Sequence, residues 1–306
     1  MPKIEVIKIR TLTGHRDAVY ALSPAREENR FISGAGDGMI VSWNLANDTD
    51  GDLVARVPNS IYALQYIPER NLLVAGHNYE GLHFIDLSRK SETSSLKFTS
   101  TAIFDLKLHD QTILAACGDG RIVAVGLDPL KVLGEFRSSA KSARSLAIHS
   151  GLGHYAAGYS DNFIRIFDLK THRMIREFEA HTKSVFTVIY SPDGTRLLSG
   201  SRDAQLKILN VESGYSAENS VAAHLYAINH MTYSPDGTLL ATGSMDKTIK
   251  IWSAGELRLL KVIDRARHEG HLTSVNKLFW SGFNNWLVSG GDDRNLSVWE
   301  LKPGQP

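Results

Sequence analysis

The 306-residue sequence has a single cysteine, Cys117, so an internal disulfide cannot form. It also lacks any apolar run near the roughly 20 residues that a membrane-spanning helix needs. Residues 1–10 interleave charged residues with Ile and Val, which excludes the unbroken apolar core of a secretory signal peptide. These absences favour a cytoplasmic protein with no membrane segment, in a compartment where thiols stay reduced.

An excess of charge of one sign is missing as well. Lys and Arg number 34 and Asp and Glu 33, which leaves a formal net charge of +1. Proteins that bind nucleic acid usually carry a basic patch or stripe, so nucleic-acid binding is not predicted. Salt-sensitive retention on heparin would reverse that view. The length also exceeds that of one ordinary domain, unless the chain is a repeat assembly.

The sequence does contain a repeated unit, which is most complete in residues 270–301. Three runs in this unit, residues 274–280, 286–290 and 295–301, alternate apolar and polar residues between turn-rich breaks. Alternation with a period of two places one face of each run against a core and predicts a three-stranded antiparallel meander. Helical repeats would instead show apolar residues three and four positions apart.

The turn between the second and third runs marks seven copies of the unit. It carries Asp37, Tyr79, Asp119, Asp161, Asp203, Asp246 and Asp293, in steps of 40 to 47 residues. A period of about 40–45 residues made of four short strands is typical of a β-propeller blade. The sequence therefore predicts an all-β fold, a seven-bladed β-propeller of four-stranded antiparallel blades, that spans residues 1–306 as a single domain.

Four of the copies share polar residues at fixed intervals, and through them the chain resembles the WD-repeat family. The shared residues are His15, Ser33, Asp37 and Trp43; His181, Ser199 and Asp203, with Leu209 at the Trp position; His224, Thr242, Asp246 and Trp252; and His271, Ser289, Asp293 and Trp299. The resemblance implies that each set forms a buried, hydrogen-bonded tetrad that links the strands of one blade.

Copies two to four depart from this pattern but keep the strand alternation. Their four positions hold Val57, Ala75, Tyr79 and Ile85; Thr99, Ala115, Asp119 and Val125; and Ser139, Ala157, Asp161 and Phe167. A half-satisfied buried network is worse than none, so we expect apolar packing to replace the network in these copies.

The two ends of the chain are expected to close the ring. Residues 5–12 precede the first Gly-His pair as the fourth strands precede theirs, and the chain ends soon after the third strand of the last copy. An open propeller would expose unpaired strand edges. The N-terminal strand is therefore predicted to complete the seventh blade.

The recurrence of His, Ser and Asp favours a structural role over a catalytic one. These residues are ingredients of acyl transfer, but an active site needs one constellation in one cleft, whereas this set is repeated. A second pattern, residues 268–271 with His268 and His271, is one residue short of the zinc-protease spacing, and His271 already belongs to a tetrad. The sequence predicts no catalytic residue, metal site or cofactor.

Variable positions of the repeat point to a partner-binding face. The resemblance implies that the residue after the first-strand anchor, a mostly β-branched position, and the residue before the turn Asp lie on this face. The first position holds Tyr20, Tyr62, Phe104, Arg144, Phe186, Asn229 and Asn276, and the second includes Arg202 and Met245. Aromatic residues and Arg are frequent anchors of protein interfaces.

We therefore predict a non-enzymatic scaffold or adaptor that binds other proteins or peptides, but not nucleic acid or membranes. The predicted contact residues are Tyr20, Tyr62, Phe104, Arg144, Phe186, Arg202 and Met245. The alternative for each ring is packing between blades, because aromatic side chains are often largely buried. The alternative function is an enzyme or metal-dependent site in the central channel, for which His109 and His149 are the scattered candidates.

Overall fold

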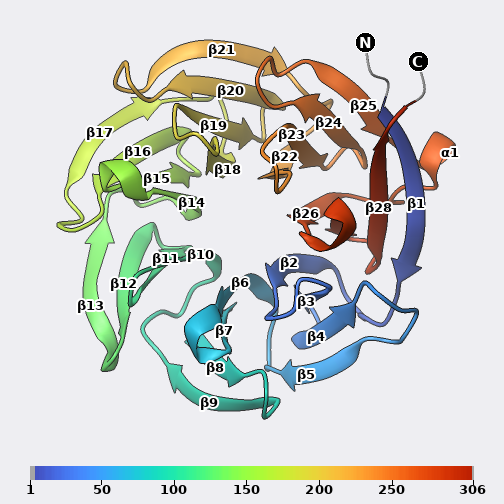
Figure 1. Ribbon diagram of the computed structural model, residues 1–306. Coiled ribbons are helices and arrows are strands. Elements are labelled where there is room, and N and C mark those ends of the chain that lie inside the picture. The colour runs from blue at the N-terminus through green and yellow to red at the C-terminus, as the bar shows by residue number, and fades with distance from the viewer. Residues whose placement is uncertain (1–3, 305–306) are drawn as a thin grey trace.

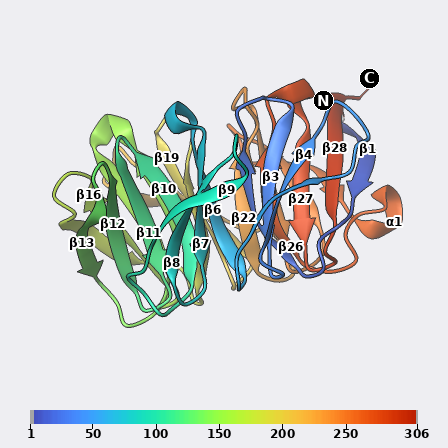
Figure 2. The same ribbon diagram turned by 90° about the horizontal axis from the view of Figure 1, so that it is seen from below.

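Seven four-stranded antiparallel sheets form a ring around a central axis (Figure 1) in the computed structural model, which describes residues 4–304. Seen from the side, the ring is a short, broad cylinder whose strands run between its two faces (Figure 2). The prediction of an all-β, seven-bladed propeller is confirmed. Within residues 4–304, no helix combines the length and apolar character needed to cross a bilayer.

Each of the first six blades uses four consecutive strands, with the first innermost and the fourth outermost. Blade 1 contains β2 (Val19–Pro24), β3 (Arg30–Ala35), β4 (Met39–Asn44) and β5 (Asp52–Arg56). Blade 2 contains β6 (Ile61–Ile67), β7 (Leu72–His77), β8 (Gly81–Asp86) and β9 (Ser91–Leu96). Blade 3 contains β10 (Ile103–His109), β11 (Thr112–Cys117), β12 (Arg121–Leu127) and β13 (Leu130–Arg137).

The second half of the ring follows the same order. Blade 4 contains β14 (Ala143–His149), β15 (His154–Tyr159), β16 (Phe163–Asp168) and β17 (Met174–Glu179). Blade 5 contains β18 (Val185–Tyr190), β19 (Arg196–Ser201), β20 (Gln205–Asn210) and β21 (Ser216–Ala222). Blade 6 contains β22 (Ile228–Tyr233), β23 (Leu239–Ser244), β24 (Ile249–Ser253) and β25 (Leu259–Ile263).

Blade 7 joins the two ends of the chain. It contains β26 (Val275–Trp280), β27 (Leu287–Gly291), β28 (Leu296–Pro303) and, as its outer strand, β1 (Ile4–Leu12). The short helices lie in connections: η1 (Pro68–Arg70), η2 (Ser150–Leu152), α1 (Arg265–His268) and η3 (Phe283–Asn285). The predicted closure by the N-terminal strand is confirmed, since β1 pairs with β28 along its whole length (Figure 1).

The hydrophobic core is divided among the spaces between neighbouring blades. The cluster between blades 1 and 2, for example, joins Ile32 and Ile40 to Ile61 and Leu73, and each of the other interfaces has a cluster of the same kind. Apolar residues on both faces of each blade are therefore buried by the next blade on either side. Ring closure is needed to cover the first and last blades.

A glycine in the second strand of most blades lets the next blade approach closely. A Cβ built on Gly200 would lie 2.7 Å from Cγ2 of Ile228, the anchor residue that begins the inner strand of blade 6. Such a distance is shorter than any ordinary carbon contact, so a side chain there would push the blades apart. The equivalent glycines in the other blades are Gly34, Gly76, Gly158, Gly243 and Gly290, each against the following anchor.

Every inner strand contains a β-bulge at the same place, directly after the anchor. In β2 the pairing with β3 shifts between Val19 and Ala21, which leaves Tyr20 without a pairing partner. The same shift occurs in β6, β10, β14, β18, β22 and β26. In a bulge, two residues of one strand lie opposite one residue of its partner strand, which changes the direction of the side chains. The bulge therefore changes which residues face the axis.

Removal of β1 tests the closure of the ring. Deletion of residues 1–10 takes away Ile4 and Val6, which pack between blades 6 and 7, and Ile9, which packs between blades 7 and 1. These side chains are partly buried, so each contributes about 1 kcal/mol, and at 2–4 °C per kcal/mol the melting temperature should fall by roughly 6–12 °C. The control is Glu5→Ala/Thr11→Ala, which changes exposed side chains of the same strand. A deletion no more harmful than this control would contradict the role of β1.

Candidate functional site: the axial cavity and the polar tetrads

A cavity of about 320 Å³ lies on the axis of the ring, where the inner strands begin. We call it the axial cavity. It is lined by Tyr20, Tyr62, Phe104, Asp105, Arg144, Ser145, Phe186, Asn229, His230, Asn276 and Lys277. All seven bulged residues are among them, one from each blade.

Four aromatic rings and one arginine form a continuous arc around this cavity. The ring centroids of Tyr20 and Tyr62 are 4.8 Å apart, and those of Tyr62 and Phe104 are 5.6 Å apart. The Arg144 guanidinium carbon lies 3.8 Å from the Phe104 centroid and 4.9 Å from that of Phe186. Because the four rings are half-buried and belong to none of the inter-blade clusters, they are surface of the cavity rather than core of the ring.

The opposite side of the cavity is built from amides that join neighbouring blades. Asn229 donates from Nδ2 to the Ser274 hydroxyl and to the Val275 carbonyl, both at 2.9 Å. Asn276 donates to the Val19 carbonyl at 3.2 Å and to the Asp292 carboxylate at 2.7 Å. Hydrogen bonds therefore fix this wall across the closure of the ring.

The residues that follow the bulges also reach the axial cavity, and our sequence analysis missed them. These residues are Asp105, Ser145, His230 and Lys277. In a regular strand, consecutive side chains point to opposite faces. The bulge breaks this rule, so that Phe104 and Asp105 both line the cavity.

Asp105 is the buried carboxylate of the axial cavity and is fully hydrogen-bonded. It accepts from Lys107 Nζ at 3.0 Å and from the backbone N–H groups of Leu106 and Leu146 at 2.9 and 2.8 Å. Burial opposes its ionisation, but the charges of Lys107 and Lys277 and these hydrogen bonds together hold the pKa of Asp105 below its ordinary value. It is a charged anchor between blades 3 and 4 and not a free base.

His230 is a neutral hydrogen-bond donor in the wall of the cavity. Its Nδ1 accepts the backbone N–H of Leu278 at 3.3 Å. Burial, and then the charges of Lys277 and Lys107, lower the pKa of His230 well below its ordinary value. A neutral imidazole whose Nδ1 accepts a hydrogen bond carries its proton on Nε2.

Arg202 and Met245 lie outside the cavity, on its rim. Their side chains are exposed, and their backbone N–H groups bond to the carbonyls of Ser184 and Ala227, both at 2.9 Å, beside the starts of β18 and β22. The structure thus places these two predicted contact residues on the same face as the arc but apart from its rings.

Four exposed apolar side chains on this face were also missed from the sequence. They are Leu225, Tyr226, Met245 and Leu272, with exposed fractions of 84%, 61%, 57% and 55%, and we call them the apolar patch. Leu225 and Leu272 occupy the same position in the neighbouring blades 6 and 7, directly after the tetrad His. Exposed apolar side chains that gather on one face often mark an interaction site. The signal in the sequence is Leu directly after the tetrad His, where blade 1 has Arg16.

The tetrads form hydrogen-bonded chains within their blades. In blade 7, Trp299 donates to the Ser289 hydroxyl at 2.8 Å, that hydroxyl lies 2.8 Å from His271 Nε2, and His271 Nδ1 lies 2.9 Å from the Asp293 carboxylate. Blades 1, 5 and 6 repeat the pattern, with no Trp in blade 5. Complete tetrads therefore sit in blades 6, 7 and 1, around the seam where the chain ends meet.

In these chains Ser, His and Asp are bonded in the order of a catalytic triad, but a substrate could not reach the hydroxyl group. The hydroxyl-bearing residues Ser33, Ser199, Thr242 and Ser289 are all 0% exposed. Each Asp carboxylate also accepts the backbone N–H of the residue after its His, as Asp246 does from Leu225 at 3.0 Å. The tetrads therefore hold the loops of this face, including the leucines of the apolar patch.

Burial decides the charge states in the tetrads. It lowers the pKa values of His15, His181 and His224, which keeps these rings neutral near pH 7. For Asp246, burial opposes ionisation, but the hydrogen bonds from His224, from Thr248 and from the Leu225 backbone N–H outweigh it and hold its pKa below the ordinary value. A neutral His that donates to a carboxylate is a stable structural pair.

In blades 3 and 4, apolar packing replaces the Ser and Trp positions of the network as expected, since Ala115, Val125, Ala157 and Phe167 are buried in the core clusters, but it does not replace the turn Asp. Their turn carboxylates remain and are neutralised by arginines: Arg121 Nη2 lies 2.7 Å from Asp119, and Arg165 Nη2 lies 2.9 Å from Asp161. In blade 4, Ser139 also donates to Asp161 at 2.6 Å. A guanidinium supplies several donors, so it can satisfy a carboxylate that has lost its histidine.

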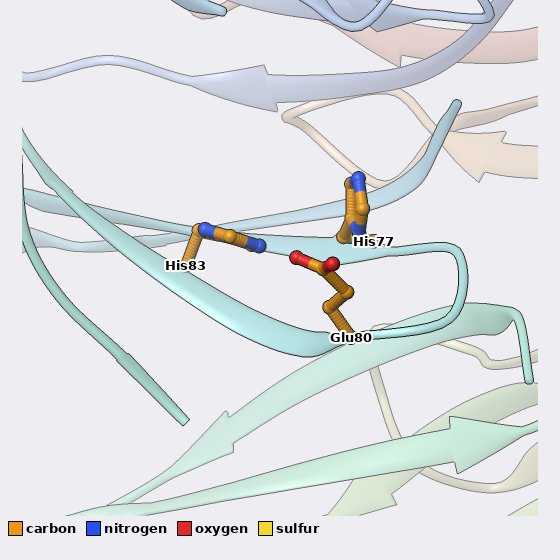
Figure 3. A group of neighbouring side chains, drawn as sticks. All are labelled: His77, Glu80 and His83. Carbon is orange, nitrogen blue, oxygen red and sulfur yellow. The ribbon is translucent and has the colours of Figure 1, made fainter. Parts of the chain in front are cut away.

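Blade 2 carries a different polar group, His77, Glu80 and His83, whose ligand-type atoms lie within 4.8 Å of one another (Figure 3). Such a set could hold a divalent metal. His77 Nε2, however, accepts the backbone N–H of Asn59 at 2.9 Å, so the His77 proton lies on Nδ1, where a metal would need a lone pair. His83 Nδ1 faces Glu92 at 3.1 Å. His77 Nδ1 is buried and makes no hydrogen bond, so the three side chains lie near one another without forming a bonded network.

The other histidines singled out from the sequence lie away from the axial cavity. His109 contacts Asp110 at 3.4 Å, and His149 bonds to the Gly194 carbonyl at 3.0 Å between blades 4 and 5. His268 lies in α1 and contacts Asp264, whereas His271 belongs to its tetrad. None of these side chains brings a ligand or base to the axis.

Removal of a tetrad member should cost stability. In His271→Ala, the Ser289 hydroxyl and the Asp293 carboxylate each lose one hydrogen-bond partner but keep Trp299 and the Leu272 N–H, so the loss should total about 1–3 kcal/mol. Asp293→Asn should cost a similar amount. Denaturant unfolding measures this, with His109→Ala as the control because that histidine lies outside the tetrads. Equal stability of His271→Ala and His109→Ala would remove the structural assignment.

Comparison with known proteins agrees with this geometry. The family model described as "WD domain, G-beta repeat" matches residues 7–44, 172–210, 217–253 and 264–300. Each range contains one tetrad and the first three strands of its blade, and the inner three strands of blades 2 to 4 are not matched. The solved WD40 β-propeller domain of Doa1 superposes with a TM-score of 0.84 and 16% identity, over 96% of this chain and 97% of that chain.

Curated proteins match at lower coverage. Striatin-3 from Homo sapiens is 24% identical over 209 residues, which are 66% of this chain and 22% of striatin-3. The guanine nucleotide-binding protein subunit beta from Arabidopsis thaliana is 23% identical over 231 residues, 70% of this chain and 61% of that subunit. The chain thus spans about a fifth and about three fifths of these relatives. With four recognised repeats in a closed seven-bladed ring, the chain is a WD40-repeat β-propeller.

Proposed function

We propose that this propeller is a non-enzymatic scaffold or adaptor that binds other proteins or peptides on the face where the axial cavity opens. The observation that carries the proposal is the aromatic arc with Arg144, which lines an accessible cavity instead of packing between blades. Rigid aromatic rings and arginine in a partly desolvated pocket are typical of binding hot spots.

The apolar patch extends this binding surface beyond the cavity. Tyr226 and Met245 are neighbours, since the Tyr226 carbonyl accepts from the Ser244 hydroxyl at 3.2 Å. Leu225 and Leu272 present their side chains from backbone held by the tetrad carboxylates at 3.0 Å. A partner that covers both the arc and the patch would bury a polar-rimmed apolar surface, which is how protein interfaces are usually built.

The relatives support a role in assembly. One of them is by name a subunit, which means a chain that works in contact with others. We also propose that residues 1–306 behave as one domain located in the cytoplasm, with no nucleic acid or membrane among the partners. A single cooperative unfolding transition is expected for one closed ring.

The alternative of an enzyme or metal-dependent site on the axis has weak support in the geometry. Asp105 and His230 do line the cavity, but Asp105 already holds its hydrogen bonds and His230 offers a donor. A general base needs a free lone pair within reach of a substrate. Recognition therefore fits these groups better than proton abstraction.

Substitution of aromatic residues in the arc should weaken the binding of partner proteins without unfolding the propeller. We expect Tyr62→Ala/Phe104→Ala to capture its specific partners at least tenfold less in a quantitative pull-down, because two hot-spot rings contribute more than 1.4 kcal/mol together. The matched control is Leu133→Ala/Ile175→Ala, which removes exposed apolar side chains from the outer strands β13 and β17. Circular dichroism and the melting temperature confirm folding of both variants. Unchanged partners in the arc variant would overturn the proposal.

A further inference from the structure

Two cations face the axial cavity without a counter-ion. Among residues 4–304, neither the Arg144 guanidinium nor the Lys277 ammonium makes a hydrogen bond or an ion pair with another side chain or with backbone. The Arg144 guanidinium instead stacks on the faces of Phe104 and Phe186. A guanidinium stacked in this way keeps its N–H edge free for a planar acceptor.

The buried carboxylate nearby does not neutralise them. Asp105 is held by Lys107 at 3.0 Å, so one anion and three cations, Arg144, Lys107 and Lys277, share this part of the axis. The other acids near the mouth, Asp17 and Asp292, are exposed on the rim. Two positive charges are therefore left over inside the cavity.

The lowered pKa values of Arg144 and Lys277 agree with a lack of negative charge around them in the cavity. Burial lowers the pKa of Arg144 to about 10, opposed only by the Tyr62 hydroxyl. Burial lowers the pKa of Lys277 to about 8; Asp105 opposes this shift and Lys107 adds to it. A buried cation without a partner costs stability, and an anion in the cavity would offset that cost.

The neutral groups around the cations are arranged as donors. His230 carries its proton on Nε2, because Nδ1 accepts the Leu278 N–H. A cationic guest is disfavoured, since Arg144 already covers the ring faces of Phe104 and Phe186 that would bind it. The chemistry that fits is an oxyanion, which accepts charge-assisted hydrogen bonds from Arg, Lys and a neutral donor together.

We propose that the axial cavity receives an oxyanion, a carboxylate or a phosphate, carried on a side chain of the protein partner, with Arg144 and Lys277 as its charged contacts and His230 as a neutral donor. The proposal rests on the proposed function and names the partner chemistry. Partner apolar residues beside this group would cover the apolar patch. Recognition of a partner would thus depend on one acidic or phosphorylated residue at the axis.

The test uses the full chain and three blocked pentapeptides that differ only at the central residue: Glu, phosphoserine or Gln. Inorganic phosphate is a fourth probe. Binding is measured as the rise of the melting temperature with ligand concentration at constant ionic strength, because a ligand selective for the folded state raises it by mass action. We expect the Glu and phosphoserine peptides to bind at least tenfold more tightly than the Gln peptide.

The Lys277→Met variant tests whether the oxyanion binds in the axial cavity. It keeps the side-chain length, removes an unpaired buried cation and so should not lower the melting temperature, whereas affinity for the Glu and phosphoserine peptides should fall at least tenfold. Arg144→Met should do the same. Lys131→Met, an equal charge change on the outer strand β13, should leave affinity unchanged. Equal binding of the Gln peptide, equal binding by Lys277→Met, or binding of phosphate with no peptide binding would each overturn the proposal.

A pH profile with the Glu peptide adds a readout that a structural role would not move. Affinity should fall as the pH rises above about 8 and Lys277 loses its proton, and the profile of Lys277→Met should be flat there. Of the groups that face Lys277, Asp105 and His230 titrate well below this range, and Lys107 holds Asp105. Around the rest of the cavity, the pKa of Tyr20 is raised to about 12 and that of Arg144 is about 10.

The two proposals can fail separately. If Tyr62→Ala/Phe104→Ala loses its partners while Lys277→Met retains them and the peptides do not discriminate, the scaffold function stands and the oxyanion site is wrong. If the arc variant retains all partners, the proposed function itself fails.

Discussion

At one position of its second strand, each blade has glycine or alanine where the first-strand anchor of the next blade packs, and the spacing of the ring depends on this contact. Six blades use glycine, against the anchors Ile61, Ile103, Val185, Ile228, Val275 and Val19. Blade 3 has Ala116 instead, and the anchor that follows is Ala143, the smallest of the seven. The methyl group of Ala116, where the other blades have glycine, is matched by the smaller side chain of Ala143, where they have Ile or Val, so the interface stays closely packed.

The bulges lie beside these contacts, and they determine which side chains reach the axis. The anchor residue is locked against the neighbouring blade, and the bulge comes directly after it in every inner strand. Two consecutive side chains per strand can then face the axis, which is how a ring of short strands gathers both an aromatic arc and a set of charges. The tetrads hold the loops around the mouth of the same cavity. The packing of the blades thus determines the shape of the site, whereas its chemistry depends on cavity-lining residues that do not pack between blades.

Much of the fold could be predicted from the sequence because it rests on repetition. The turn Asp at regular intervals indicated the blade count, and residues 5–12 indicated the closing strand. The bulged positions, such as Tyr62 and Arg144, could be named because the repeat aligns them. Period-two alternation places the residue after each bulged position on the opposite face, so a bulge that the pattern does not show hid four of the eleven cavity-lining residues, Asp105, Ser145, His230 and Lys277. Arg121 and Arg165 follow the carboxylates that they neutralise by only two and four residues, but they were missed because they stand outside the tetrad positions that the repeat defines.

The contact between Gly200 and Ile228 allows the most direct test of this account. Gly200→Ala should cost more than about 2 kcal/mol in the native chain, because the new methyl group meets Ile228 at 2.7 Å. In the Ile228→Ala background, which reproduces the Ala116 and Ala143 pair, the same substitution should cost less than about 0.5 kcal/mol. The measurement is a double-mutant cycle by denaturant unfolding. An equal cost of Gly200→Ala in both backgrounds would contradict the claim that this contact sets the spacing of the blades.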